Sequence, residues 1–504
     1  MRIIRIFVLS VLIFACTAIT AAASAEPMRG VWVSTVYNLD FPSRKSMSAS
    51  ELKAEIDNIV DDCASMGFNA VFFQVRPCAD ALYPSAIYPW SAVLSGTQGV
   101  APDGGFDPLA YWIKKCHSMG IELHAWINPY RVTKSKDAEF AALSPQNPAV
   151  LHPEWVVKHS DGNYYLNPGI AEVRALVTNG VREIIDNYNV DGIHMDDYFY
   201  PGSEFEDADT FAVYGNGFTD IGDWRRNNVN LLVKSIFDTV HSSGKNITFG
   251  ISPAGIWNNK STDPNGSDTR GNPSYSSHYA DSVKWVKDGI IDYLAPQIYW
   301  EFGYSAADYG VLAKWWENVF DGSNVKLYIG LASYRGVGAT ENSAWYSGTE
   351  TGRQMSYNAA SNVIDGEIHF RYKLIASDAD VRNVITQRYR QISVFVNGAK
   401  VVFDTPPIIV NDRTMVPLRA VFEALGADVD WNDAEKRVDA VLGDDKVTLK
   451  IGEDFMSVNG EKIPLDSPPF IKDGRTLIPL RAVSEAFRYN VEWNGDTKTV
   501  TIRR

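Results

Sequence analysis

Between residues 27 and 389 the chain alternates short apolar runs with amphipathic stretches. The short runs predict buried strands, and the amphipathic stretches predict helices, for example over residues 49–66, 107–119, 171–188 and 224–243. Strands that alternate with helices build a parallel sheet. Eight strands are predicted, at residues 29–35, 70–76, 121–128, 192–197, 248–253, 293–300, 326–333 and 367–372.

Eight strand–helix units in about 360 residues have the size of a (β/α)₈ barrel with insertions. The predicted fold class is therefore α/β, a TIM barrel over residues 27–389 followed by a small C-terminal α+β domain. A doubly wound open sheet is the alternative. It would ordinarily carry a glycine-rich phosphate-binding turn after an early strand, and the sequence has no such turn there.

The last part of the chain, residues 391–504, contains an internal repeat. Each motif recurs 62 positions downstream, as from Arg413 to Arg475 in RTMVPLRAV and RTLIPLRAV. VNG, DTPP/DSPP and VDWN/VEWN recur with the same offset. A fixed period predicts two copies of one structural unit, at about 391–452 and 453–504, each with strands and one short helix.

The first 25 residues have the pattern of a signal peptide. Arg2 and Arg5 precede an apolar run, and the Ala-Ser-Ala at 23–25 fits the cleavage rule. We therefore expect an exported protein, secreted or held at the cell surface or cell wall. The alternatives are a retained anchor, for which the run is short, and lipidation of Cys16, which follows a poor lipobox.

Cysteine content and net charge argue against several classes of function. Cleavage would leave Cys63, Cys78 and Cys116, an odd number without a C-x-x-C pair, so buried thiols are favoured over disulfides or a catalytic cysteine. The formal net charge of −14 argues against a nucleic-acid partner, because phosphate binding needs clustered Lys and Arg. Apolar residues make up 45% of the chain, which is ordinary for a globular protein.

Strand parity places polar and aromatic side chains inside the barrel. Alternate residues of a barrel strand point inward, and functional residues lie at the carboxyl ends of the strands. The inward faces are predicted to carry Gln74 and Arg76; Glu122, His124, Trp126, Asn128 and Tyr130; His194 and Asp196; and Gln297, Tyr299 and Glu301. Burying so many polar groups is costly unless they are paired or hydrated, so a functional site is expected at this mouth.

Five carboxylates fall at or just after strand ends: Asp40, Asp80, Asp196, Asp197 and Glu301. Hydrolysis of a glycosidic bond typically uses two carboxyl groups, one as proton donor and one as nucleophile or base. Asp196 is the predicted nucleophile. Glu301 is the predicted general acid/base, since nearby aromatic residues would raise its pKa, and Asp197 is a further catalytic candidate. The alternative for any one of them is a helix cap or an ion pair.

Aromatic residues near the strand ends favour a sugar substrate, because flat rings stack on the apolar faces of sugar rings. Each ring taken alone is more often a core residue. The predicted substrate-binding residues are Gln74, Arg76, Asp80, Trp126, Asn128, Tyr130, His194, Tyr198, Tyr200, Gln297, Tyr299 and Trp300. No cofactor and no metal is expected.

Six motifs resemble the glycosyl-hydrolase-like 10 family of bacterial exported proteins. They are RGVWVS (29–34), FFQVRP with DALYPS (72–85), HAWINPYR (124–131), DGIHMDDYFYP (191–201), GISP (250–253) and APQIYW (295–300). The resemblance implies a (β/α)₈ fold and, in one branch, hydrolysis of peptidoglycan glycan strands stripped of their peptides. The spacing that ends at Asp196 is also similar to the fourth-strand nucleophile motif of α-amylase-type barrels, an analogy between folds.

The C-terminal copies resemble copper amine oxidase N-terminal-like repeats. Residues 391–504 contain neither His nor Cys, so the usual ligands for copper are missing. The resemblance suggests instead a wall-binding or spacer role.

Two other functions stay open beside a polysaccharide hydrolase. One is a carbohydrate-binding surface protein that has lost a catalytic carboxylate. The other is a metal-dependent hydrolase that uses His124, His194 and Asp196, although no H-x-H or H-E-x-x-H spacing supports it.

Overall fold

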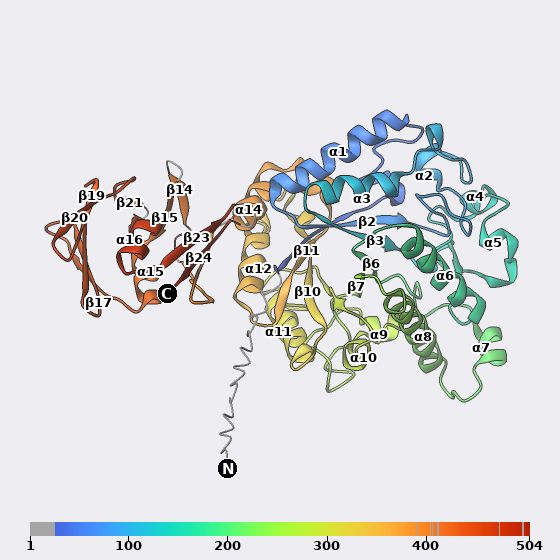
Figure 1. The fold of residues 1–504 in the computed structure, drawn as a ribbon. Helices are drawn as coiled ribbons and strands as arrows, with labels where there is room; N and C mark the ends of the chain where they lie inside the picture. The colour runs from blue at the N-terminus through green and yellow to red at the C-terminus, as the bar shows by residue number, and fades with distance from the viewer. Residues whose placement is uncertain are drawn as a thin grey trace, which may run out of the picture.

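The computed structural model describes residues 26–390, 392–403, 405, 407–410, 413–472, 474–495 and 498–504. The predicted signal peptide and Cys16 lie outside these residues. In the described part of the chain, no helix is both long and apolar enough to span a membrane. A barrel domain and a strand-rich C-terminal domain follow one another along the chain (Figure 1).

The barrel domain is a closed parallel barrel, as predicted. The strand order is β11-β1-β2-β3-β6-β7-β8-β10, and β10 also pairs with β11, which closes the ring. In the described residues this gives eight strand positions, with the sixth split into two short strands. The strands are β1 (Met28–Val33), β2 (Ala70–Arg76), β3 (Glu122–Ile127), β6 (Gly192–Met195), β7 (Thr248–Ile251), β8 (Tyr293–Leu294), β9 (Gln297–Ile298), β10 (Lys326–Leu331) and β11 (Ile364–His369).

Two strands differ from their predicted form. The sixth is interrupted between β8 and β9 at Ala295-Pro296, because proline has no N–H for the ladder. The last strand begins three residues earlier than predicted, and Tyr372, expected in it, begins helix α13 (Tyr372–Ser377).

Helices surround the barrel and cover its outer face (Figure 1). Helix α1 begins with a capping box formed by Ser48 and Glu51, and it ends at left-handed Gly67. The longer helices are α1 (Ala49–Met66), α3 (Pro108–Ser118), α6 (Ala171–Asn187), α8 (Ile221–His241), α11 (Tyr309–Phe320), α12 (Thr349–Ala360) and α14 (Ala379–Tyr389). Shorter elements are α2 (Ala92–Ser95), α4 (Lys136–Ala141), α5 (Pro148–Leu151), β4 (Val156–Lys158), β5 (Tyr164–Leu166), α7 (Ala208–Tyr214), α9 (Ser274–Ser277) and α10 (Ser282–Asp288).

The barrel has two apolar layers. The larger one lies between the strands and the helices, and it includes the predicted buried thiols Cys63 and Cys116. The smaller one fills the barrel and is rich in aromatic residues, including Trp32, Phe72 and Tyr293. Loops that carry α2, α4, α5 and α7 follow β2, β3 and β6, and they lie on the right-hand side of Figure 1. This side is therefore the mouth, where the carboxyl ends of the strands meet.

The C-terminal domain repeats its elements at the 62-residue offset, as from β15 (Arg413–Pro417) to β22 (Arg475–Pro479). The first series is β12 (Ser393–Val396), β13 (Ala399–Lys400), β14 (Ile408–Val410), β15, α15 (Leu418–Leu425), β16 (Asp428–Asn432) and β17 (Arg437–Leu442). The second is β19 (Phe455–Val458), β20 (Glu461–Pro464), β21 (Phe470–Lys472), β22, α16 (Leu480–Ala486), β23 (Asn490–Asn494) and β24 (Thr499–Arg503), and β18 (Asp445–Lys450) stands between them.

The two series do not form two separate domains. Strand β12 of the first pairs with β24 of the second, and β15 pairs antiparallel with β22 around Val416 and its counterpart Ile478. Both helices contribute to one apolar core. Neither series has a complete sheet by itself, so this part of the chain is one intertwined domain.

Candidate active site

Asp196 lies at the mouth, directly after β6, with its carboxyl group buried. The side chain of Asn128, which follows β3, donates from Nδ2 to both carboxyl oxygens of Asp196 at 2.6 Å. Asp196 itself is only 4% exposed. The two neighbouring strands β3 and β6 therefore bring together two residues that are 68 positions apart in sequence.

The orientation of Asn128 is fixed by its other contacts. Its Oδ1 accepts a hydrogen bond from Gln74 Nε2 at 2.7 Å and one from Arg131 Nη2 at 2.5 Å. Gln74 is held in turn, because its Oε1 accepts from the backbone N–H groups of Thr35 and Val36 at 2.9 Å. With Oδ1 occupied by two donors, the amide N–H groups of Asn128 must face Asp196.

Burial is the main influence on the acidity of Asp196. Burial first, and then the charge of neighbouring Asp197, raise the pKa of this carboxyl to about 7. The Arg131 charge and the hydrogen bond from Asn128 act in the opposite direction. Asp196 can therefore gain or lose a proton close to neutral pH.

Asp197, the next residue in the chain, provides a second carboxyl group at the mouth of the barrel. Burial raises its pKa, whereas the charge of His278 and a hydrogen bond from Gln297 lower it. Both partners are held by the backbone: His278 Nδ1 lies 2.9 Å from the carbonyl oxygen of Tyr200, and Gln297 Nε2 donates to that of Ser252 at 2.8 Å. Buried Asp196 and half-buried Asp197 are thus two neighbouring acids whose ionisations influence each other.

His194 lies one inward position below Asp196 on β6. Trp32 Nε1 donates to His194 Nε2 at 3.1 Å, and His194 Nδ1 lies 3.0 Å from Tyr293 Oη. Burial lowers the pKa of His194 well below its usual value, so the ring is neutral. Its interior position confirms the parity prediction, and its ring nitrogens face protein groups below the mouth.

His124 occupies the neighbouring inward position on β3. Its Nδ1 lies 3.2 Å from Tyr293 Oη, and its Nε2 lies 3.2 Å from Glu122 Oε2. Its ring stacks on Phe72 at 4.5 Å between centroids. These contacts point His124 away from Asp196, and the described residues contain no group of three His, Cys, Asp or Glu side chains that could hold a metal ion.

Glu301 lies beyond β9, in the turn before α11. Its carboxylate accepts a hydrogen bond from Trp345 Nε1 at 3.0 Å, and it lies 3.6 Å from Arg335 Nη1. The Glu301 carboxylate therefore contacts an aromatic residue, Trp345, and a cation, Arg335.

Two of the predicted aromatic residues, Tyr198 and Tyr299, lie near the two acids. The pKa of Tyr299 is raised by burial and, next, by the charge of Asp197. Tyr198 is 45% exposed and its ring faces Arg131. Trp126 points into the barrel, where it is 5% exposed.

Arg76 does not point into the barrel as predicted. A bulge after Gln74 shifts the pairing of β2 with β3, so that Arg76 pairs with Ile127, which faces the helices. The guanidinium carbon of Arg76 lies 3.9 Å from the ring centroid of Tyr88. Its Nη1 is close enough to Gly180 of α6 that a Cβ there would clash at 2.8 Å. Arg76 therefore belongs to the layer between β2 and α6.

Three predicted aromatic contacts lie in the outer apolar layer instead of the open mouth. Tyr130 and Tyr200 are fully buried there, and Trp300 packs against the same layer. Tyr200 packs edge-on against Phe205 and Tyr279. The parity rule fails for Tyr130 because β3 has already ended at Ile127, so alternation no longer sets the direction of its side chain.

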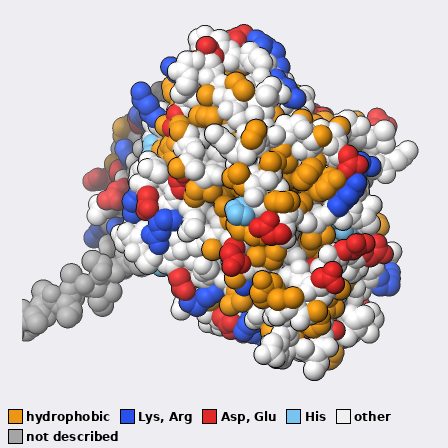
Figure 2. Space-filling model, turned by 90° about the vertical axis from the view of Figure 1, so that its right-hand side faces the viewer, with side chains coloured by type: hydrophobic (Ala, Val, Ile, Leu, Met, Phe, Trp, Pro, Cys, Tyr) orange, Lys and Arg blue, Asp and Glu red, His pale blue; other side chains and the backbone are white. Residues whose placement is uncertain are grey.

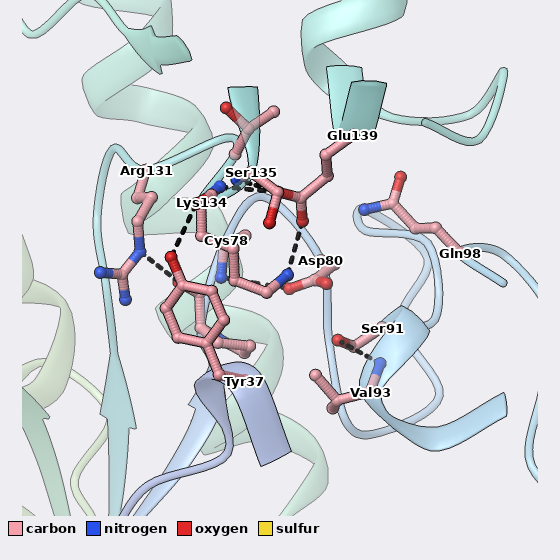
Figure 3. A network of polar contacts seen from close by, with 12 residues as sticks. Tyr37, Cys78, Asp80, Ser91, Val93, Gln98, Arg131, Lys134, Ser135 and Glu139 are labelled. Atoms are coloured by element: carbon pink, nitrogen blue, oxygen red, sulfur yellow. Dashed lines mark hydrogen bonds and ion pairs between the residues drawn. The ribbon is translucent and has the colours of Figure 1, made fainter. Parts of the chain in front are cut away.

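Asp80 lies at the rim, in the loop after β2 (Figure 3). It is 4% exposed, and its carboxylate accepts a hydrogen bond from the Cys78 N–H at 3.2 Å. Burial raises its pKa, while a hydrogen bond from Ser91 and the charge of Lys134 lower it. Burial also raises the pKa of the Cys78 thiol to about 12, so this cysteine is unreactive, as predicted. Asp80 therefore braces the loop after β2, and Arg131 Nε, which donates to the carbonyl oxygen of Pro77 at 2.9 Å, joins this loop to the one after β3.

The sequence did not predict Arg131 and His278 as site residues, and it indicated Asp40 only as one of the carboxylates at strand ends. Arg131 stands in the HAWINPYR motif, so its match to the family motif was the available signal. His278 directly follows helix α9, which is too short to give a periodic signal. Asp40 forms a buried ion pair with Arg371 at 2.6 Å, which is a structural role.

Comparison with known proteins assigns the barrel to a family. The model of the family "Glycosyl hydrolase-like 10" matches residues 27–347. The chain belongs to the glycosyl hydrolase-like 10 family. It is 44% identical to "Glycosyl hydrolase YngK" of Bacillus subtilis over 358 residues, which cover 70% of this chain and 69% of that protein. It is 41% identical to "Glycosyl hydrolase DigH" of Escherichia coli over 374 residues, or 70% and 84% of the two chains.

This glycosyl hydrolase-like 10 protein is a glycoside hydrolase, a class in which two carboxyl groups at a barrel mouth are expected. Membership in the family favours the hydrolase over the carbohydrate-binding alternative. The C-terminal domain matches the model "Copper amine oxidase N-terminal domain" once, over residues 395–502. One match over both repeats agrees with their intertwined fold.

Proposed function

We propose that this protein is an exported glycosidase that cuts peptidoglycan glycan strands, with Asp196 and Asp197 as its reacting carboxyl groups. The observation that carries the proposal is that Asp197 lies beside Asp196, which is buried at the mouth and oriented by Asn128. The signal-peptide pattern of residues 1–25 supports a substrate outside the cytoplasm, and the family resemblance suggests the class of glycan.

The chemistry follows from the shared environment of the two acids. Two carboxyl groups in one site do not ionise independently, so near neutral pH one holds a proton while the other carries the charge. Glycosidic hydrolysis needs this division: a proton for the leaving oxygen and a charge to attack or to activate water. The two hydrogen bonds from Asn128 favour the charged form of Asp196, so we assign Asp196 as the partner that ionises as the pH rises through about 7, and Asp197 as the proton donor.

Glu301 is the alternative proton donor. Its ion pair with Arg335 and its hydrogen bond from Trp345 suit a structural role as well. Asp197 is preferred because it shares the site with Asp196.

The test is cleavage of purified glycan strands, with and without peptide stems, and mass spectrometry of the products. We expect Asp196→Asn to lower kcat by about 10³-fold or more. Asp197→Asn should lose activity on glycan but regain it on an aryl glycoside, whose leaving group needs no proton. If Glu301→Gln has this signature instead, Glu301 is the donor. Asp186→Asn, at an exposed position of α6, is the control.

The C-terminal domain is proposed to attach the enzyme to the cell wall. It contains a groove of about 1080 Å³ lined by Ile409, Trp493 and Lys498, among other residues. Trp493 is 37% exposed, and Lys498 Nζ lies 6.0 Å from the centre of its ring. An exposed aromatic ring beside a cation is suited to a sugar with acidic groups.

A further inference from the structure

Two tyrosines at the rim of the mouth are unusually exposed for large aromatic residues. Tyr37, in the loop after β1, is 57% exposed, and Tyr198, in the loop after β6, is 45% exposed. Figure 2 looks at the mouth and shows hydrophobic side chains gathered around a histidine and acidic side chains. An exposed apolar patch at an enzyme's mouth marks a binding surface.

Tyr37 is held in place at the expense of backbone strain. Its φ is 56° and that of Asn38 is 55°, so two consecutive residues other than glycine are left-handed. The Tyr37 hydroxyl donates to the carbonyl oxygen of Lys134 at 2.6 Å, and the Lys134 ammonium lies 5.7 Å from the ring centre (Figure 3). Residues held in sparsely populated conformations cluster at functional sites, and here the strain and the anchor together fix an exposed ring.

Tyr198 connects the same rim to the two acids. The guanidinium carbon of Arg131 lies 4.9 Å from the Tyr198 ring centre. Arg131 also donates to Asn128, the residue that orients Asp196. The loop after β3 therefore contacts both tyrosines, Tyr37 through Lys134 and Tyr198 through Arg131.

We propose that Tyr37 and Tyr198 form a subsite that binds a sugar ring of the glycan beside the bond that is cut. The inference rests on the proposed function, because it takes a glycan as the substrate. A flat phenol ring offers an apolar face to the C–H face of a sugar. A fixed ring loses little conformational entropy when the sugar binds, so the strained backbone and the Lys134 anchor would contribute affinity by preorganisation.

The experiment measures KM and kcat on peptide-free glycan oligosaccharides, and glycan binding by calorimetry in an Asp196→Asn background. We expect Tyr37→Ala and Tyr198→Ala each to weaken binding and raise KM about tenfold, with a smaller effect on kcat. Tyr37→Phe keeps the ring and loses the anchor to Lys134, so its effect should be intermediate. Tyr214→Ala, at a 58% exposed position of α7, is the matched control and should change neither quantity.

The outcomes separate this inference from the proposed function. Unchanged binding and KM in both alanine variants, while the wild type cleaves glycan, would overturn the subsite and leave the hydrolase standing. A wild type that neither binds nor cleaves glycan would overturn both. Because Tyr37 is exposed, a folded Tyr37→Ala is expected, and its melting curve checks this.

Discussion

A carboxyl group buried at the mouth is costly to ionise, and the structure keeps Asp196 there with only partial compensation. Asn128 and Arg131 favour its charged form, but burial outweighs them and raises its pKa to about 7. The usual pKa of aspartate is 3.8. The folded protein therefore holds this proton up to a pH at which the unfolded chain has already released it, and a carboxyl in that state is poised for proton transfer.

This pKa shift makes stability depend on pH in a defined direction. Between pH 4 and 7 the folded state binds more protons at Asp196 than the unfolded state, so stability is lost as pH rises through this range. The variant Asp196→Asn has no carboxyl group to ionise, so it avoids the free-energy cost of a buried charge. We expect the variant to exceed the wild type by about 2–4 kcal/mol at pH 8 and by little at pH 4, measured by urea unfolding at both values. A stability difference that stays constant with pH would contradict the assignment.

At the scale of elements, strand parity was a reliable guide only where a strand remains regular. It placed Gln74, Asn128 and Asp196 together at the mouth, because each lies on or directly after a regular stretch of strand. It failed for Arg76, where a bulge intervenes, and for Tyr130, which lies beyond a strand end. Bulges and loop directions depend on tertiary packing, which no local pattern encodes.

The same limit explains the residues that were missed. The periodic segments predicted helix α1 at the bounds it has, since a capping box and a left-handed glycine mark its two ends. His278 gave no such signal, because helix α9, which it follows, is too short to show a period. The sequence showed the repeat in the C-terminal domain but did not predict that its two halves are intertwined. The pairing of β12 with β24 is a long-range contact, which local sequence patterns do not encode.

The bulge in β2 gives two neighbouring polar residues opposite roles. Gln74 Nε2 donates to Asn128 inside the barrel, whereas Arg76 stacks on Tyr88 outside it. We expect Gln74→Met to lower kcat about tenfold or more, because Asn128 then loses an orienting donor. Arg76→Met should leave kcat and KM within about twofold of the wild type, since an apolar side chain of similar length can occupy the outer layer. Steady-state kinetics of both variants tests these two expectations, and melting curves check that both variants are folded. A raised KM for a folded Arg76→Met would restore the original prediction that Arg76 binds substrate.

At the scale of the whole molecule, the chain joins a barrel that carries the acids to a domain with a groove of its own. The groove is lined mostly by residues of the second series, together with Ile409, Arg413 and Thr414 of the first. Strand β18 is inserted between β17 and β19. In the other sheet β12 pairs directly with β24, with no strand between them. The inserted strand breaks the symmetry, so residues at equivalent positions have different surroundings.

This asymmetry provides a matched pair of variants for the proposed wall attachment. Ile409 lines the groove and is 46% exposed. Its counterpart Ile471 stands 62 residues later, is 48% exposed, and is not among the groove residues. Because the two side chains are alike in type and exposure, a general loss of surface hydrophobicity would affect both variants equally. Only a ligand in the groove would distinguish them.

We therefore expect Ile409→Ala and Trp493→Ala to reduce sedimentation of the full-length enzyme with insoluble cell walls, and Ile471→Ala to leave it unchanged. The loss should be several-fold, as for removal of apolar contact area from a binding groove. Cleavage of soluble oligosaccharides should not change in any of the three, because the acids lie in the other domain. Equal sedimentation of Ile409→Ala and Ile471→Ala would place wall attachment outside this groove. A loss of soluble activity in Trp493→Ala would instead show that the two domains act on the substrate together.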